Sequence, residues 1–331
     1  MIKKGTGISC AFQGSNTHFG HFDISSVILE VSEENDFLFH VAASDVGQGL
    51  EATLLTIVSD AFGGLPVERI RWSWSKTSSP NGGVTGASRQ TTITGNAVFN
   101  ACKELKKILF SVASEIMDVP PDEGFEIEGD FIISSSDHKV LLSEIIEQAR
   151  KEGRKLEVMG EFIAPPTTMI DEHGKGEGIN QFGYATCIAE VEVNTETGEL
   201  IVISVSAYID GGRIISPIGA ESQIEGGIVM GLGYATSEEY IMDSGKHVNV
   251  GFTNYLIPSV HDSPAPDIKV HFINSAVPMG ELGVKGLAEL PNTMIAPAIT
   301  NAIYNATGAR ITKLPATPER IYQAIQKAEK S

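Results

Sequence analysis

The sequence has few cysteines and no long apolar run. Its three cysteines (Cys10, Cys102 and Cys187) lie far apart and form no Cys-x-x-Cys pair, so they cannot by themselves hold an iron–sulfur cluster or a structural zinc ion. An odd number of thiols is typical of the reducing cytoplasm, where we expect this chain. No apolar stretch reaches the roughly 18 to 20 residues of a membrane-spanning helix, so we predict neither a membrane partner nor a signal peptide.

Basic residues are scarce as well. The 331 residues include 24 lysines and arginines against 42 aspartates and glutamates, which gives a formal net charge of −18. Such a chain repels phosphates at long range, which argues against a nucleic-acid partner. A ligand that carries phosphate would have to be held by local backbone N–H groups and a few side chains.

The remaining composition is typical of a globular protein with a core, since 42% of the residues are hydrophobic and 34 are glycines. Strand and helix patterns interleave without a strict strand–helix–strand repeat, so we predict an α+β fold. We expect one unit over residues 1–331, with two mixed lobes divided near 153–183. The patterns predict strands at 26–31, 37–43, 69–75 and 267–273, a hairpin at 184–210, and helices at 50–61, 96–117, 216–235, 296–308 and 317–330.

Two glycine-rich loops precede helices. In "DVGQGLEAT" (45–53), glycines flank Gln48 and leave helix N–H groups to face an anion, although an ordinary strand-to-helix turn is the alternative. In "PNGGVTGASRQTT" (80–92), small residues allow a ligand to lie against the backbone, and side-chain donors follow them. This loop matches neither the phosphate-binding P-loop nor a dinucleotide motif, and a simple connection with ordinary caps is its alternative.

Two further loops carry polar residues. In "GAESQIEGGIVMGLG" (219–233) the glycines favour helix packing, and Gln223 is the one residue that we expect to contact a ligand. In "GELGVKGLAELPN" (280–292), Glu289 stands between apolar neighbours. A carboxylate held there would be poorly hydrated and more basic than one in water, as a general base must be, although most glutamates lie at the surface.

Together with "FTNYLIP" (252–258), these loops occur in the order seen in the molybdenum hydroxylases, the xanthine dehydrogenase and aldehyde oxidase family. The chain resembles the second molybdopterin-binding domain of that family from about Gly5 to Ile325. The resemblance implies that Glu289 is the catalytic glutamate and that the residues contacting the pterin cofactor and its phosphate are Gln48, Gly86, Ala87, Ser88, Arg89, Gln90, Thr91 and Gln223. Ala288 replaces a glycine that is common before the glutamate. Its methyl group restricts φ at this position and so affects the direction of the Glu289 side chain.

The family hydroxylates an electron-poor carbon beside a ring nitrogen or an aldehyde oxygen, with water as the oxygen source. The resemblance implies that Glu289 is the general base. It also implies that the pterin holds the molybdenum, so that the protein supplies no metal ligand. Bacterial members generally use the molybdopterin cytosine dinucleotide form, whose extra phosphate suits the loop at 80–92.

In most relatives this domain is the second half of a longer molybdenum subunit, and "GTGISCAFQG" resembles a segment from the middle of it. Some bacterial members divide the subunit into two polypeptides, and the chain resembles the medium molybdopterin subunit of nicotinate dehydrogenases. This implies three partners: a second molybdopterin subunit, an iron–sulfur subunit and an FAD subunit. The implied substrate is an N-heterocycle such as nicotinate. Purines, aldehydes, a non-catalytic scaffold and a cofactor-insertion chaperone remain alternatives.

Other residues fit structural roles better than chemical ones. His18 and His21 could face a substrate channel, but isolated histidines near strands are more often structural. Trp72 and Trp74 share the parity of Ile70 along one strand, so we expect them in the core.

Overall fold

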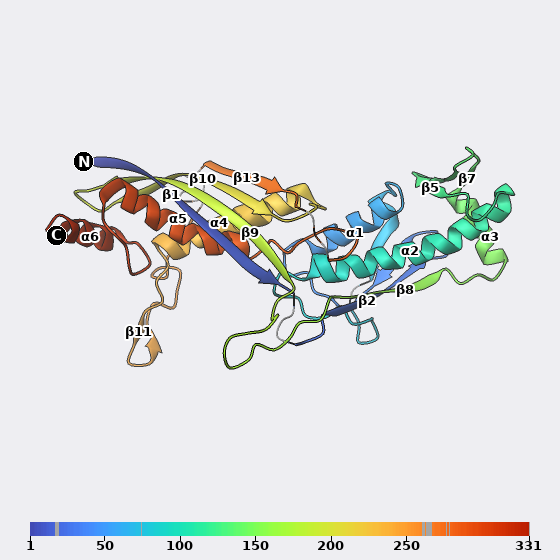
Figure 1. The fold of residues 1–331 in the computed structure, drawn as a ribbon, viewed down its shortest axis with the longest axis horizontal. Helices are drawn as coiled ribbons and strands as arrows, with labels where there is room; N and C mark the ends of the chain where they lie inside the picture. Colours follow the sequence, from blue (N-terminus) through green and yellow to red (C-terminus); the bar gives the residue numbers. More distant parts are fainter. Residues whose placement is uncertain are drawn as a thin grey trace.

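The computed structural model describes residues 1–16, 20–73, 75–259, 262, 267–275, 277 and 279–330, so His18 and Trp74 lie outside the described residues. The molecule is elongated, and both termini lie at one end (Figure 1). Helices and sheets are mixed throughout, which confirms the α+β prediction. No helix among the described residues is long and apolar enough to cross a bilayer.

The half of the molecule far from the termini is built on a sheet of strand order β4–β3–β2–β8. Its strands are β2 (Ile24–Val31), β3 (Phe37–His40), β4 (Ile70–Ser73) and β8 (Glu157–Ile163). Helix α2 (Gln90–Met117) crosses this sheet and packs closely on β8. Gly160 allows this contact, since a Cβ there would lie 2.2 Å from the Ala101 nitrogen. Helix α1 (Leu50–Ala61) packs beside α2 over a core that includes Phe37, Phe39 and Leu105.

This half continues into a small sheet of β5 (Phe125–Glu128), β6 (Phe131–Ser134) and β7 (Lys139–Leu141), followed by α3 (Leu142–Lys151). A 3₁₀ turn, η1 (Val67–Arg69), leads into β4.

The other half is built on a sheet of strand order β1–β9–β10–β13. Its strands are β1 (Ile2–Ser15), β9 (Gln181–Asn194), β10 (Leu200–Asp210) and β13 (Asp267–Ile273). Helix α5 (Leu290–Thr307) lies directly on β1. Gly7 allows this close approach, since a Cβ there would lie 2.1 Å from the Ala298 oxygen. Helix α4 (Pro217–Thr236) packs beside α5, and α6 (Pro318–Ala328) closes the core.

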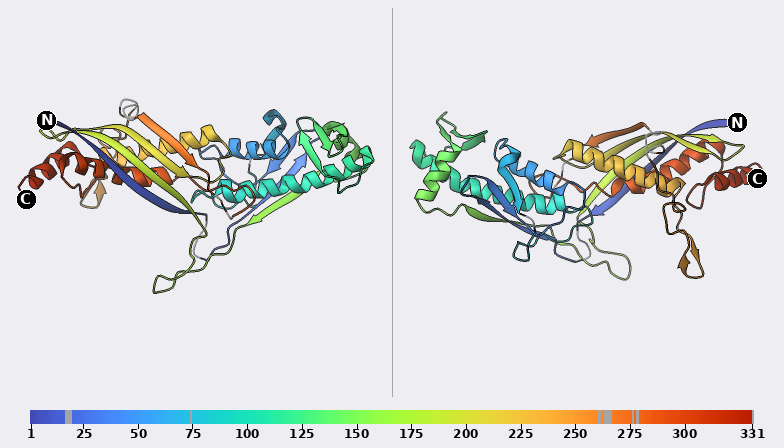
Figure 2. Two further views of the ribbon diagram at one scale, coloured as in Figure 1. Left: turned by 45° about the horizontal axis from the view of Figure 1, so that its top comes forward. Right: turned by 180° about the vertical axis from the view of Figure 1, so that it is seen from behind.

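The chain passes between the two four-stranded sheets twice, after β1 and again between β8 and β9, where a long loop projects from the body (Figure 2). Buried Gln181 ties this junction together. Its Oε1 accepts hydrogen bonds from Ser15 Oγ at 2.9 Å and Thr92 Oγ1 at 3.2 Å, and its Nε2 donates to the Val284 oxygen at 3.1 Å. Strands from one sheet and the start of α2 on the other are therefore held at fixed relative positions.

Several elements differ from the sequence prediction. The hairpin at 184–210 and the helix at 50–61 are confirmed, whereas α2 begins at Gln90 rather than Asn96 and α5 at Leu290 rather than Ala296. Strands β1 and β8 and the small sheet were not predicted. A short hairpin of β11 (Met242–Asp243) and β12 (Lys246–His247) also projects from the body (Figure 1).

Candidate functional site

A cavity of about 270 Å³ lies where the four glycine-rich loops meet. Every residue predicted for the site lines it: Gln48, Gly86, Ala87, Ser88, Arg89, Gln90, Thr91, Gln223 and Glu289. The structure therefore brings together segments that are up to about 240 positions apart in the sequence, as expected for a shared binding site.

Four helices begin at this cavity. Its lining includes the first turns of α1 and α2, the N-terminal residues of α4, and the residue that precedes α5. From this region α2 and α5 run toward opposite ends of the molecule (Figure 1). The first N–H groups of a helix lack partners within the helix and carry partial positive charge, so converging helix starts favour an anionic ligand.

The loop before α2 is rich in available donors. The backbone N–H groups of residues 84–88 and 90–92 donate to no described residue. The carbonyl oxygens of Gly82, Val84, Gly86 and Ala87, by contrast, all accept hydrogen bonds. Ala87 and Ser88 have positive φ values of 53° and 49°. This arrangement turns acceptors into the protein and leaves donors for a ligand, as in backbone nests that bind anions.

Glu289 lies beside this loop. Its Oε2 accepts a hydrogen bond from Ser88 Oγ at 2.6 Å. The contact depends on Gly286, because a Cβ there would lie 2.2 Å from the Ser88 oxygen. The expectation that Glu289 is poorly hydrated is wrong for this chain, since its side chain is exposed. Its apolar neighbours Leu290 and Pro291 turn into the core and do not cover the carboxylate.

The two glutamines differ in their availability. Gln48 is bound within its own loop, since its Oε1 accepts from the Val46 nitrogen at 2.6 Å and its Nε2 donates to the Ser44 oxygen at 3.2 Å. Gln223, on α4, makes no side-chain hydrogen bond within the described part of the chain. Its amide is therefore free to donate and accept in the cavity.

The start of α1 does not leave its N–H groups open in the way that the loop at 45–53 suggested. Asp45 accepts from the Gly47 nitrogen at 2.9 Å and from the Glu51 nitrogen at 3.0 Å. Burial raises the pKa of Asp45, but backbone N–H groups at the helix start lower it more, so the pKa lies below its ordinary value. A carboxylate of the chain itself occupies part of the place expected for an external anion.

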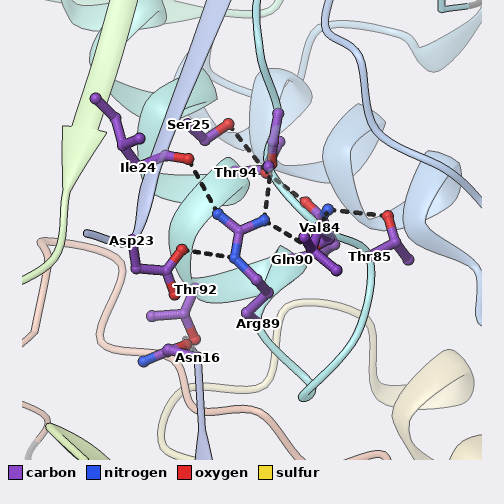
Figure 3. A network of polar contacts seen from close by, with 12 residues as sticks. Asn16, Asp23, Ile24, Ser25, Val84, Thr85, Arg89, Gln90, Thr92 and Thr94 are labelled. Atoms are coloured by element: carbon purple, nitrogen blue, oxygen red, sulfur yellow. Dashed lines mark hydrogen bonds and ion pairs between the residues drawn. The ribbon is translucent and has the colours of Figure 1, made fainter. Parts of the chain in front are cut away.

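The donor roles expected of the Arg89 and Gln90 side chains also need correction. Both side chains are buried and bind protein partners in a network of polar contacts (Figure 3). Gln90 Nε2 donates to the Val84 oxygen at 3.1 Å and to Thr85 Oγ1 at 3.0 Å. The backbone N–H of Gln90 remains available to a ligand, whereas that of Arg89 donates to the Gly86 oxygen at 3.3 Å.

Two cations in the lining were not predicted. Lys285 Nζ lies 2.7 Å from Asp210 Oδ2 in a largely buried ion pair, and Arg213 lies 3.2 Å from Asp60 in a half-exposed one. Burial raises the pKa of Asp210, but the hydrogen bonds from Lys285 and Ser275 lower it more, so the net direction is downward. Lys285 lies within the "GVKG" motif, and Arg213 follows a predicted strand in "DGGR", which were the available signs.

Known proteins match this chain over nearly its whole length. The molybdopterin cofactor-binding domain family matches residues 1–264. Aldehyde oxidoreductase of Megalodesulfovibrio gigas is 30% identical over 98% of this chain and 32% of its own length. Subunit gamma of the 6-hydroxypseudooxynicotine dehydrogenase complex of Paenarthrobacter nicotinovorans is 28% identical over 99% of this chain and 41% of its own length.

A solved structure shows the same fold. The aldehyde oxidoreductase from Desulfovibrio gigas superposes with a TM-score of 0.82 at 28% identity, covering 98% of this chain and 33% of that protein. The chain thus spans less than half the length of the relatives that it matches. It belongs to the molybdopterin cofactor-binding domain family of the molybdenum hydroxylases.

Proposed function

We propose that this chain is the molybdopterin-binding subunit of a multi-subunit molybdenum hydroxylase, in which residues 1–331 form one two-lobed binding domain. The observation that carries the proposal is the meeting of four distant loops at one cavity, with Ser88 hydrogen-bonded to Glu289. A scaffold that had lost its cofactor would have no reason to keep polar groups on all four loops.

The residues present fit a cofactor that is both planar and phosphorylated. The free N–H groups of residues 84–88 and 90–92 and the starts of α2 and α4 suit phosphate, in spite of the overall negative charge. The amide of Gln223 and the loop of Gln48 suit the polar edges of a pterin. Within the described residues, no three His, Cys, Asp or Glu side chains meet as a metal site. We therefore propose that the molybdenum is held by the cofactor, in its cytosine dinucleotide form.

When bound, this cofactor supplies the two-electron oxidation that adds oxygen from water to the substrate carbon. The chain's own part is proton transfer. Ser88 Oγ holds Glu289 Oε2, whereas Oε1 accepts from no other group in the described part of the chain. Glu289 Oε1 then takes the proton from the attacking water as general base. The exposure of Glu289 implies that a partner polypeptide closes this side of the site and excludes solvent.

The proposed substrate is an N-heterocycle such as nicotinate. One relative is named for 6-hydroxypseudooxynicotine, another for aldehydes and a third for xanthine, so purines and aldehydes remain alternatives. The proposed partners are a second molybdopterin subunit, an iron–sulfur subunit and an FAD subunit, in the cytoplasm. The name of the gamma subunit of a dehydrogenase complex supports a divided enzyme.

The test is purification of the native complex, mass spectrometry of its subunits, and molybdenum analysis followed by assays with N-heterocycles, purines and aldehydes. We expect about one molybdenum per chain and release of a cytosine nucleotide on hydrolysis. A complex that never contains metal would favour a scaffold, and metal that is bound only transiently would favour an insertion chaperone.

A further inference from the structure

Arg89 is a fully buried cation that the proposed chemistry does not use. Its side chain is 1% exposed, and Nε donates to Asp23 Oδ1 at 2.7 Å. Nη1 donates to the Gly82 oxygen at 2.7 Å and the Val84 oxygen at 2.9 Å, and Nη2 donates to the Ile24 oxygen at 3.1 Å (Figure 3). One guanidinium thus joins the start of β2 to the loop that leads into α2.

The loop wraps around this guanidinium. Gly83 has a φ of +71°, and a Cβ there would lie 2.7 Å from both terminal nitrogens of Arg89. Gln90 Nε2 donates to the Val84 oxygen, and Thr94 Oγ1, which donates to Gln90 Oε1, lies 3.3 Å from the Gly82 oxygen. The carbonyl groups of the loop are therefore fixed toward the interior by several donors at once.

The same loop holds two strained residues. Ala87 and Ser88 both have positive φ, which costs on the order of 1 to 2 kcal/mol for a residue with a side chain. Such a conformation persists only where the surroundings impose it. In this conformation the free N–H groups line the cavity, and the Ser88 hydroxyl reaches Glu289.

We propose that the buried Arg89–Asp23 pair is a positioning device for the ligand-binding loop at 84–91. By binding the carbonyl oxygens of Gly82 and Val84, the guanidinium selects the loop conformation that presents N–H donors and Ser88 to the cavity. The identity of that ligand as a molybdopterin rests on the proposed function. Lysine cannot replace Arg89 in this role, because a single ammonium cannot reach Asp23 and three carbonyl oxygens in a fixed fork.

The experiment compares Arg89→Lys with Arg150→Lys in the purified complex. Arg150 makes a suitable control because it also binds a side-chain oxygen and backbone, donating to Asn35 Oδ1 at 2.8 Å and to the Ser32 oxygen, far from the cavity. We expect Arg89→Lys to lower the molybdenum content per folded chain on the order of 10-fold, as for supporting residues of metal sites. Arg150→Lys should keep the wild-type content at a similar loss of thermal stability.

A second pair of variants covers the case in which Arg89→Lys does not fold. Gly83→Ala keeps Arg89 but forces the loop and the guanidinium apart, and Gly64→Ala is its control, because Gly64 has a similar φ of +85° but open space at its Cβ. Only Gly83→Ala should lose molybdenum. Normal molybdenum content in Gly83→Ala, or in a folded Arg89→Lys, would overturn the proposal.

A measurement without cofactor separates this proposal from the proposed function. Trypsin cleaves after either arginine or lysine, so Arg89→Lys keeps the cleavage site. In the cofactor-free chain we expect faster cleavage after residue 89 in the variant than in the wild type, where the side chain is buried. A wild-type complex without molybdenum would refute the proposed function alone, and unchanged cleavage in the variant would refute the positioning role.

Discussion

Replacing Gly286 with alanine tests the packing between the two loops that form the centre of the site. The new Cβ would lie 2.2 Å from the Ser88 oxygen, 2.7 Å from the Ser88 Cβ and 3.0 Å from the Ser15 Cβ. Since ordinary contacts are longer than about 3.4 Å, the loops must separate by roughly 1 Å. Overpacking of this kind typically costs about 1 to 3 kcal/mol of folding stability.

The larger effect of Gly286→Ala should be on turnover. A shift of about 1 Å at a reacting group can cost on the order of 100-fold in rate, and here the shift would act on the hydrogen bond between Ser88 and Glu289. The assay measures kcat at saturating substrate, molybdenum content and thermal unfolding of the purified complex. We expect a strong loss of kcat and a decrease of a few degrees in Tm.

Gly226→Ala is the matched control for this substitution. Gly226 lies in α4 near Gln223, no atom lies within 4 Å of its added Cβ, and alanine is the better helix former by about 1 kcal/mol. This variant should keep full activity with equal or higher stability. Full activity and unchanged Tm in Gly286→Ala would refute the close contact between the loops and the role assigned to it.

Three further predictions concern the polar groups. Glu289→Gln should lower turnover by at least about 100-fold with full molybdenum content, as loss of a general base does, and near-normal turnover at full metal loading would contradict that role. Ser88→Ala should lower kcat about 10-fold and leave Tm nearly unchanged in a thermal melt. The expected loss is at the lower end for a hydrogen bond to a charged group, because Glu289 is exposed. The pKa of Asp210 in the folded protein lies below its ordinary value of 3.8. Its pair with Lys285 therefore stabilises the fold above pH 3.8, and this stabilisation is lost as the pH falls through the pKa of the folded state. Asp210→Asn should therefore lose about 1.5 to 3 kcal/mol in chemical unfolding at pH 7, and a difference from wild type that did not shrink below pH 3.8 would contradict the ion pair.

The sequence predicted those helices and strands whose own residues show the apolar period of a helix or a strand. The helix at 50–61 and the hairpin at 184–210 have apolar residues at the helix and strand periods. Strand β1 was missed because its inward residues include Gly5, Gly7 and Ser9, which carry no hydrophobic signal. Their small size is what allows α5 to lie directly on the strand.

The start of α2 was missed for a related reason. Its first turns bury polar side chains, Gln90, Thr92 and Thr94, which a search for apolar periodicity passes over. Their burial depends on hydrogen bonds to residues such as Ser25 and Gln181, far away in the sequence. A local pattern cannot show such partners.

The membership of the site was predictable, but the direction of its side chains was not. The motifs identified the four loops at the cavity but not the segment 211–215, which also lines it. The neighbours of Glu289 along the chain are apolar, yet they pack into the core and leave the carboxylate exposed. Arg89 has the chemistry of a ligand donor, but the carbonyl oxygens at 24, 82 and 84 take up its guanidinium. What flanks a residue in sequence does not determine what surrounds it in space.

The difference between long-range charge and local donors explains how an acidic chain can hold an anionic ligand. The net charge of −18 acts at long range, where salt at physiological concentration screens it beyond about 8 Å. At the cavity, the fixed donors are backbone N–H groups and helix starts, which act at contact distance and need no net positive charge. Three cations are in the lining of the cavity. Each is paired with an aspartate, Lys285 with Asp210, Arg213 with Asp60 and Arg89 with Asp23, which offsets much of their charge. Binding in this site therefore depends on the shape of the loop backbone, and the residues that fix this shape are as important as those that touch the ligand.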